Sequence, residues 1–124
     1  MRPPCVITAV VALSVTAAIG GCSKDNGSSA PTYKVDSTDT TCDVEKTDLA
    51  SGPATFEVSN SGSDVTEVYI YAEGGDFTDI VEEAENIGPG TARSLDVDLN
   101  PGQYHVTCKP GMTGDGISTL ITVK

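Results

Sequence analysis

The stretch Ser94–Cys108 reads SLDVDLNPGQYHVTC, and it decides the fold class. Apolar and polar residues alternate on both sides of Asn100-Pro101-Gly102, where Pro and Gly pre-set a tight turn. Because successive side chains of a β-strand point to opposite faces of a sheet, each half is predicted to be a strand with one buried face. That face contains Leu95, Val97 and Leu99 before the turn, and Tyr104, Val106 and Cys108 after it.

The same alternation extends outward from this strand pair. Further strands are predicted around Ala54–Val58, over Glu67–Ala72 and around Ser118–Val123, whereas Phe77–Ile87 fits either a strand or a helical turn. The segments between these strands contain glycine, proline, serine and asparagine, which favour turns and loops. About six to eight short strands at this spacing predict an all-β domain, either a sandwich or a small barrel.

The charge of the chain narrows the class of partner. Seven Lys and Arg residues against 18 Asp and Glu residues give a formal net charge of −11. Nucleic-acid binding depends on cationic side chains that neutralise phosphates, so this class is excluded. Cations remain as partners, although an acidic surface also serves solubility. The acidic cluster Asp76, Asp79, Glu82, Glu83 and Glu85 has the same two interpretations, a face that attracts cations or a plain solvated face.

The start of the chain has the pattern of an export signal. Arg2 precedes an apolar run of about 14 residues over 6–19, which is the length of a signal-peptide core and too short to span a bilayer. The junction Ile19-Gly20-Gly21-Cys22 resembles the bacterial lipobox, in which the cysteine receives the lipid, including palmitate, before cleavage. The alternative is an ordinary secretory signal with a cysteine near its cut site.

These features predict three segments and a location. We expect a lipoprotein signal peptide over 1–21, a flexible tether over 22–31 that is rich in Gly, Ser and Asn, and one folded domain over 32–124. A protein that carries acyl chains at Cys22 would be held on the extracytoplasmic face of the cell membrane.

Two cysteines remain once Cys5 leaves with the signal peptide and Cys22 is lipidated. In an oxidising compartment Cys42 and Cys108 are expected to form a disulfide, which would contribute about 4 kcal/mol of stability. The alternative is a metal site that uses one or both sulfurs.

Several stretches of the predicted domain are similar to those of one known family. In chain order they are Cys42, Gly52–Asn60 (GPATFEVSN), Glu67, Val81–Gly90 (VEEAENIGPG) and Pro101–Cys108 (PGQYHVTC). Together they resemble the cupredoxin-like domain of the EfeO iron-uptake proteins, over about residues 32–124. The resemblance implies a Greek-key β-sandwich and partners in iron uptake, a permease or a peroxidase. Longer EfeO proteins also have a helical peptidase-like domain, to which nothing in this chain corresponds.

The resemblance also implies a set of metal ligands. Glu67 occupies the place of the first copper-binding histidine of cupredoxins, and Cys108 and Met112 resemble the cysteine and methionine ligands. With Cys42 they form the predicted site: Cys42, Glu67, Cys108 and Met112, for iron or copper. A type 1 copper centre is not expected, because it needs two imidazoles and the chain has one, His105, which alternation places on the face opposite Cys108.

Two functions remain open at this stage. The first is a membrane-anchored, extracytoplasmic protein that binds a transition metal for uptake or handling. The second is a disulfide-stabilised β-sandwich that acts by protein–protein contact. An enzyme is not expected, because no nucleophile motif accompanies the one histidine.

Overall fold

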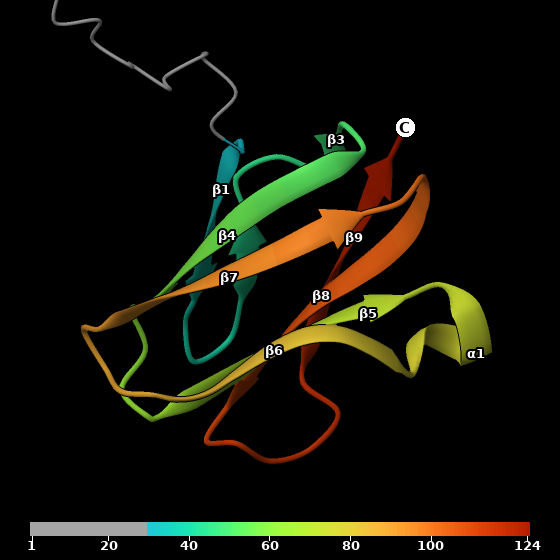
Figure 1. Ribbon diagram of the computed structural model, residues 1–124. Helices are drawn as coiled ribbons and strands as arrows, with labels where there is room; N and C mark the ends of the chain where they lie inside the picture. Colours follow the sequence, from blue (N-terminus) through green and yellow to red (C-terminus); the bar gives the residue numbers. More distant parts are fainter. Residues whose placement is uncertain (1–29) are drawn as a thin grey trace, which may run out of the picture.

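The computed structural model describes residues 30–124. The predicted signal peptide, Cys22 and most of the predicted tether lie outside these residues. The described chain folds into two β-sheets that face each other (Figure 1), so the predicted all-β sandwich is confirmed. No helix among residues 30–124 is long and apolar enough to cross a membrane.

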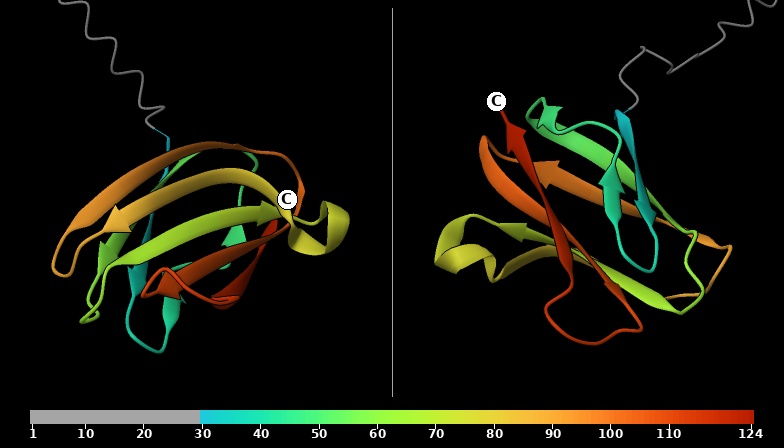
Figure 2. Two further views of the ribbon diagram at one scale, coloured as in Figure 1. Left: turned by 90° about the horizontal axis from the view of Figure 1, so that it is seen from below. Right: turned by 180° about the vertical axis from the view of Figure 1, so that it is seen from behind.

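Within residues 30–124, nine strands and one short helical turn make up the fold. In chain order they are β1 (Thr32–Ser37), β2 (Cys42–Val44), β3 (Asp48–Leu49), β4 (Gly52–Asn60), β5 (Thr66–Ala72), α1 (Gly74–Phe77), β6 (Asp79–Ile87), β7 (Ala92–Leu99), β8 (Gly102–Pro110) and β9 (Ile117–Val123). One sheet has the strand order β2-β1-β4-β7, and the other has the order β3-β9-β8-β5-β6. Both views of Figure 2 show the two layers with α1 projecting from one end.

Two strand pairs are parallel and join segments far apart in the chain. β1 pairs with β4 in one sheet, and β3 pairs with β9 in the other. The remaining pairs are antiparallel, including the long hairpin of β5 and β6. The ambiguous segment Phe77–Ile87 is therefore mostly strand, and the helical turn α1 ends where that segment begins.

The core lies between the sheets and consists of the alternating apolar positions. The largest completely buried side chains include Phe56 and Val58 of β4, Ile70 of β5, Val106 of β8 and Ile121 of β9. Because the side chains of a strand alternate, the residues between these positions face outward. The outer face of the five-stranded sheet therefore carries Glu67, Tyr69, Tyr71, His105 and Lys109, and it contains the candidate site.

Candidate functional site

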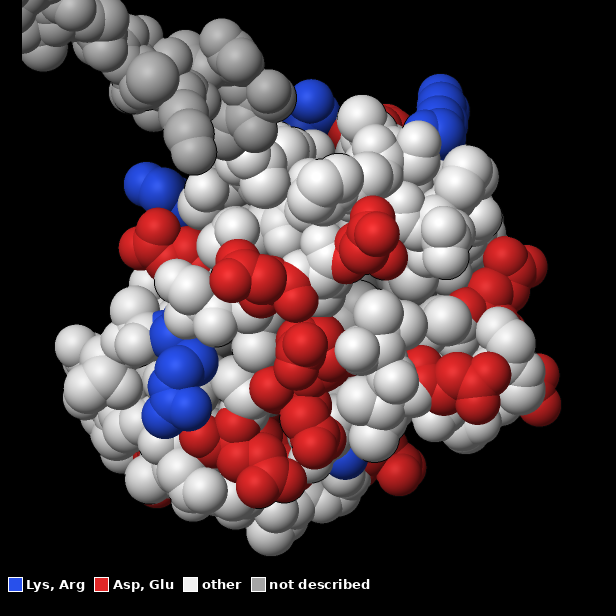
Figure 3. Space-filling view, in the orientation of Figure 1, with Lys and Arg blue, Asp and Glu red and all other residues white. Residues whose placement is uncertain are grey.

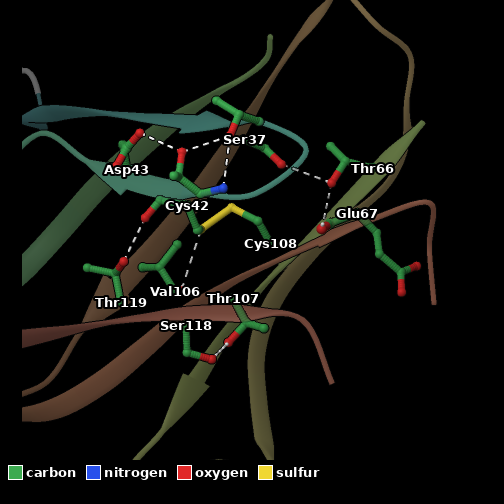
Figure 4. Close-up of a disulfide and its surroundings, with 12 residues drawn as sticks. Ser37, Cys42, Asp43, Thr66, Glu67, Val106, Thr107, Cys108, Ser118 and Thr119 are labelled. Carbon is green, nitrogen blue, oxygen red and sulfur yellow. Dashed lines mark hydrogen bonds between the residues drawn. A yellow bond between two sulfur atoms is a disulfide. The ribbon is translucent and has the colours of Figure 1, made fainter. Parts of the chain in front are cut away.

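Cys42 and Cys108 are joined by a disulfide, with an S–S distance of 2.03 Å and Cα atoms 5.5 Å apart. The bond links β2 of one sheet to β8 of the other across the core (Figure 4). Both residues are buried, and the main-chain oxygen of Cys42 accepts a hydrogen bond from the Thr119 hydroxyl at 2.6 Å. In this form the two sulfurs bond to each other, and neither is a free thiolate for a metal.

Glu67 lies on the other side of the sheet from the disulfide. Its neighbour Val68 is the residue that pairs with Cys108, whereas Glu67 itself pairs with Lys109. Figure 4 shows the Glu67 carboxylate pointing away from the two sulfurs. The carboxylate of the predicted ligand set therefore does not converge on the cysteine pair.

Met112 is the fourth residue of the predicted ligand set. It lies in the loop between β8 and β9 with a positive φ of 56°, and its amide donates to the Lys109 carbonyl at 2.9 Å. Its side chain is half-buried. Within residues 30–124, no three His, Cys, Asp or Glu side chains come together to hold a metal. The structure thus does not assemble Cys42, Glu67, Cys108 and Met112 into one site.

The residues do not fit a blue-copper centre either. Such a centre uses two imidazoles and a thiolate. His105 lies on the outer face, where its ring stacks on Phe77 with centroids 3.7 Å apart and planes 7° apart. Cys108 faces the core and is bonded to Cys42. The imidazole and the sulfur are therefore on opposite faces of β8.

A shallow hollow of about 430 Å³ lies beside this stack on the outer face. Its walls include Tyr71, Phe77, His105 and Lys109, and the hydroxyls of Thr107 and Ser118, 2.7 Å apart, lie within it. Its lining residues are both polar and apolar, and no single ligand chemistry dominates.

The side chains of Glu67, Tyr69 and Glu85 form a group of oxygen-bearing residues farther along the outer face, at the β5–β6 edge. The Tyr69 hydroxyl donates to Glu85 Oε1 at 3.3 Å, and both Tyr69 and Glu67 are 8 % exposed. Burial raises the pKa of the Tyr69 phenol, and the negative charges of Glu67, Glu85 and Glu83 raise it further. The Lys109 ammonium lies 4.5 Å from the centre of the Tyr69 ring.

This group was not predicted from the sequence, apart from Glu67. The signal was present in the spacing Glu67-x-Tyr69, which places both side chains on one strand face. Glu83 and Glu85 have the same spacing on the next strand, but in the sequence they read only as part of an acidic cluster. The strand register that joins the two pairs is set by the β5–β6 hairpin.

Comparison with known proteins connects this fold to a family. The family model described as "Cupredoxin-like domain" matches residues 7–123. The Iron uptake system component EfeO of Escherichia coli (strain K12) is 31 % identical over 96 residues, which is 77 % of this chain and 24 % of that protein; EfeO of Shigella flexneri matches equally. The chain thus spans about a quarter of the length of these curated relatives.

Solved structures with the same fold have low sequence identity to this chain. Auracyanin from Roseiflexus castenholzii matches with a TM-score of 0.58 at 18 % identity, covering 77 % of this chain and 98 % of that one. Auracyanin B matches with a TM-score of 0.60 at 14 % identity, covering 77 % and 89 %. With the fold, the family match and the similarity to EfeO in agreement, this chain belongs to the cupredoxin-like domain family, as its resemblance to EfeO predicted.

Proposed function

We propose that this protein is a lipid-anchored, extracytoplasmic cupredoxin-like domain that handles a transition metal during uptake, and that the metal is iron. The observation that carries the proposal is the 31 % identity to an iron-uptake component over 96 residues. The proposed role is to bind the ion outside the membrane and present it to a membrane partner, a permease or a peroxidase. No chemical step on a substrate is part of this role.

The donor atoms available favour iron over copper. Cuprous copper prefers thiolate and thioether ligands, and the two sulfurs of Cys42 and Cys108 are closed in a disulfide. The side chains that remain on the outer face near Glu67 offer carboxylate and phenol oxygens, which suit oxidised iron better.

Metal binding is tested on residues 22–124 with Cys22 replaced by Ser, which contain every described residue. The oxidised protein is titrated with ferric nitrilotriacetate and with cupric and cuprous salts, and bound metal is measured after gel filtration. We expect retained iron in the oxidised protein. The Cys42→Ala/Cys108→Ala double variant is the matched control, and it should retain iron equally if the sulfurs are not ligands. Absence of bound metal under all conditions would contradict the proposal.

The membrane anchor is tested separately at Cys22. Cells are grown with an alkyne analogue of palmitate, and the full-length protein is compared with its Cys22→Ser variant. We expect label and membrane association in the first and neither in the second. The Cys108→Ala variant should keep the label, because Cys108 is not the predicted site of lipid attachment. Membrane association that survives Cys22→Ser would exclude a lipid at this position as the anchor.

A second function, protein contact without metal, is favoured by one observation. The cysteines are bonded to each other, and the described residues include no group of three His, Cys, Asp or Glu ligands. The titration above separates the two candidates, since a purely structural domain retains neither iron nor copper in any redox state.

A further inference from the structure

The hollow on the outer face of the five-stranded sheet contains two rows of side chains with different chemistry. In the first row the strand register places Tyr71 directly opposite His105, and the Phe77 ring stacks on His105. In the second row, two residues farther along β8, Thr107 lies opposite Ser118 of β9. The first row therefore offers aromatic rings, and the second row offers hydroxyl groups.

The spacing of the aromatic row and the hydroxyl row follows from strand geometry. Residues two positions apart on a strand lie about 7 Å apart on the same face of the sheet. This distance is close to the width of one pyranose ring with its hydroxyl groups. A single sugar ring can therefore contact both rows at once.

The hydroxyl row has hydrogen-bonding capacity for a ligand. The Thr107 and Ser118 hydroxyls lie 2.7 Å apart, so one donates to the other, and the pair keeps one O–H group and several lone pairs. Ser118 is exposed, and Lys109 and Asp115 line the same hollow. Next to Asp115, Gly116 packs so closely on β8 that a Cβ would meet the Thr107 side chain at 2.8 Å. Donors and acceptors are thus held together at this end of the hollow.

The segment that carries the Phe77 ring has an unusual backbone. Asp76 and Phe77 have positive φ angles of 58° and 59°, a conformation that residues other than glycine adopt rarely. Such conformations persist only where the surrounding structure holds them, and they are concentrated at ligand-binding and active sites. Both residues line the hollow. The strained turn therefore serves to place an aromatic ring against the sheet.

The charges around the hollow favour a neutral ligand. The lining includes both signs, with Lys109 on one side of the balance and Asp76 and Asp115 on the other. The chain has a formal net charge of −11, and Figure 3 shows that acidic side chains outnumber basic ones on the face drawn there. This field repels anions, whereas a cation would meet the like charge of Lys109. A purely apolar ligand would cover the hydroxyl row without pairing it, which is costly.

We propose that this hollow binds a neutral pyranose ring of an oligosaccharide. The C–H groups of the sugar pack on the aromatic row, and its hydroxyls form hydrogen bonds with Ser118 and Asp115. Aromatic side chains with a few polar groups are the usual lining of small-ligand sites. The inference goes beyond the proposed function, because this binding needs no metal. Since the hollow is shallow, we expect a Kd on the order of millimolar.

The experiment uses nitrogen-15-labelled residues 22–124 with Cys22→Ser, titrated with maltotriose, cellotriose and the trimer of N-acetylglucosamine. Amide chemical shifts are followed by NMR, which detects weak binding. We expect saturable shifts with at least one of these sugars, centred on residues 105–109 and 115–118. Trigalacturonic acid, an anionic trimer, should bind more weakly than that sugar.

Two variants and a matched control test the two rows. Phe77→Gly removes a ring but permits the positive φ, and it should weaken binding about tenfold. Ser118→Ala, at an exposed position, should also weaken binding, and it keeps the test decisive if Phe77→Gly does not fold by circular dichroism. Leu120→Ala is the control and should bind as the parent does, because Leu120 is an exposed apolar residue of β9 outside the hollow.

Three results would overturn the inference. The first is the absence of saturable shifts with all three neutral sugars. The second is binding that is unchanged in both Phe77→Gly and Ser118→Ala, or that falls equally in Leu120→Ala. The third is tighter binding of trigalacturonic acid than of every neutral sugar. Because the titration contains no metal, each of these results leaves the proposed function untouched.

Discussion

Removal of the Cys42–Cys108 disulfide should destabilise the domain strongly while leaving the folded structure in place. The bond closes a loop with a sequence separation of 66 residues, and it links the two sheets through the three-residue edge strand β2. In the chain-entropy model a loop of this size restricts the unfolded ensemble by about 4 kcal/mol. For a domain of about 90 residues this corresponds to a drop in Tm of roughly 15–30 °C.

The assay compares residues 22–124 carrying Cys22→Ser with the same chain carrying Cys42→Ala and Cys108→Ala. Thermal and urea unfolding are followed by circular dichroism, and the parent is also measured with a reductant. Alanine avoids placing an unpaired hydroxyl between the sheets, where both cysteines are buried. The urea m-value should rise in the variant, because an unfolded chain without the cross-link exposes more surface.

A small drop in Tm on removal of the disulfide would refute this reasoning. If the double variant and the reduced parent both unfold within about 3 °C of the oxidised parent, the cross-link does not restrict the unfolded chain as calculated. A large drop in Tm with an unchanged m-value would instead locate the effect in the folded state.

Two further predictions concern the turns. Asn60→Ala should cost about 2–4 kcal/mol of unfolding free energy in urea titrations, because the buried amide donates to the carbonyls of Asp64 and Ile87 at 2.8 Å each; an effect below about 1 kcal/mol would mean that water replaces these bonds. Gly116→Ala should cost more than Gly114→Ala, by about 1–3 kcal/mol. Both glycines have positive φ, but only at Gly116 would a Cβ meet a backbone oxygen, at 2.7 Å; equal melting temperatures would contradict this contact.

The sandwich was predictable because hydrophobic burial imposes a period of two on the strands that line the core. Phe56 and Val106 lie in strands whose alternation is nearly complete, and both are fully buried. β1 was harder to predict. Its inner positions include Ser37, which is buried through a hydroxyl contact with Thr66 at 3.0 Å rather than through an apolar side chain.

For the predicted ligand set, the deciding feature is the side of the sheet on which its residues lie. Alternation already placed Val68 on the core face of its strand and Cys108 on the core face of another, which puts Glu67 on the opposite side. The resemblance to a family supplied the residues but not the side of the sheet on which each one lies. The position of Glu67 opposite Glu85 could not be predicted, because it depends on a bulge at Asn86 that no composition signal marks.

The parallel pairing of β3 with β9 affects when the chain can fold. Asp48 and Leu49 of β3 pair with Thr122 and Val123 of β9, which come much later in the sequence. The disulfide partner of Cys42, Cys108, also comes much later. During synthesis, β3 meets its strand partner only after β9 has emerged from the ribosome, and Cys42 meets its disulfide partner only after β8 has emerged. Folding dominated by such distant pairings is slow, on the order of milliseconds to seconds. A chain with this topology completes its five-stranded sheet only when translation has reached β9.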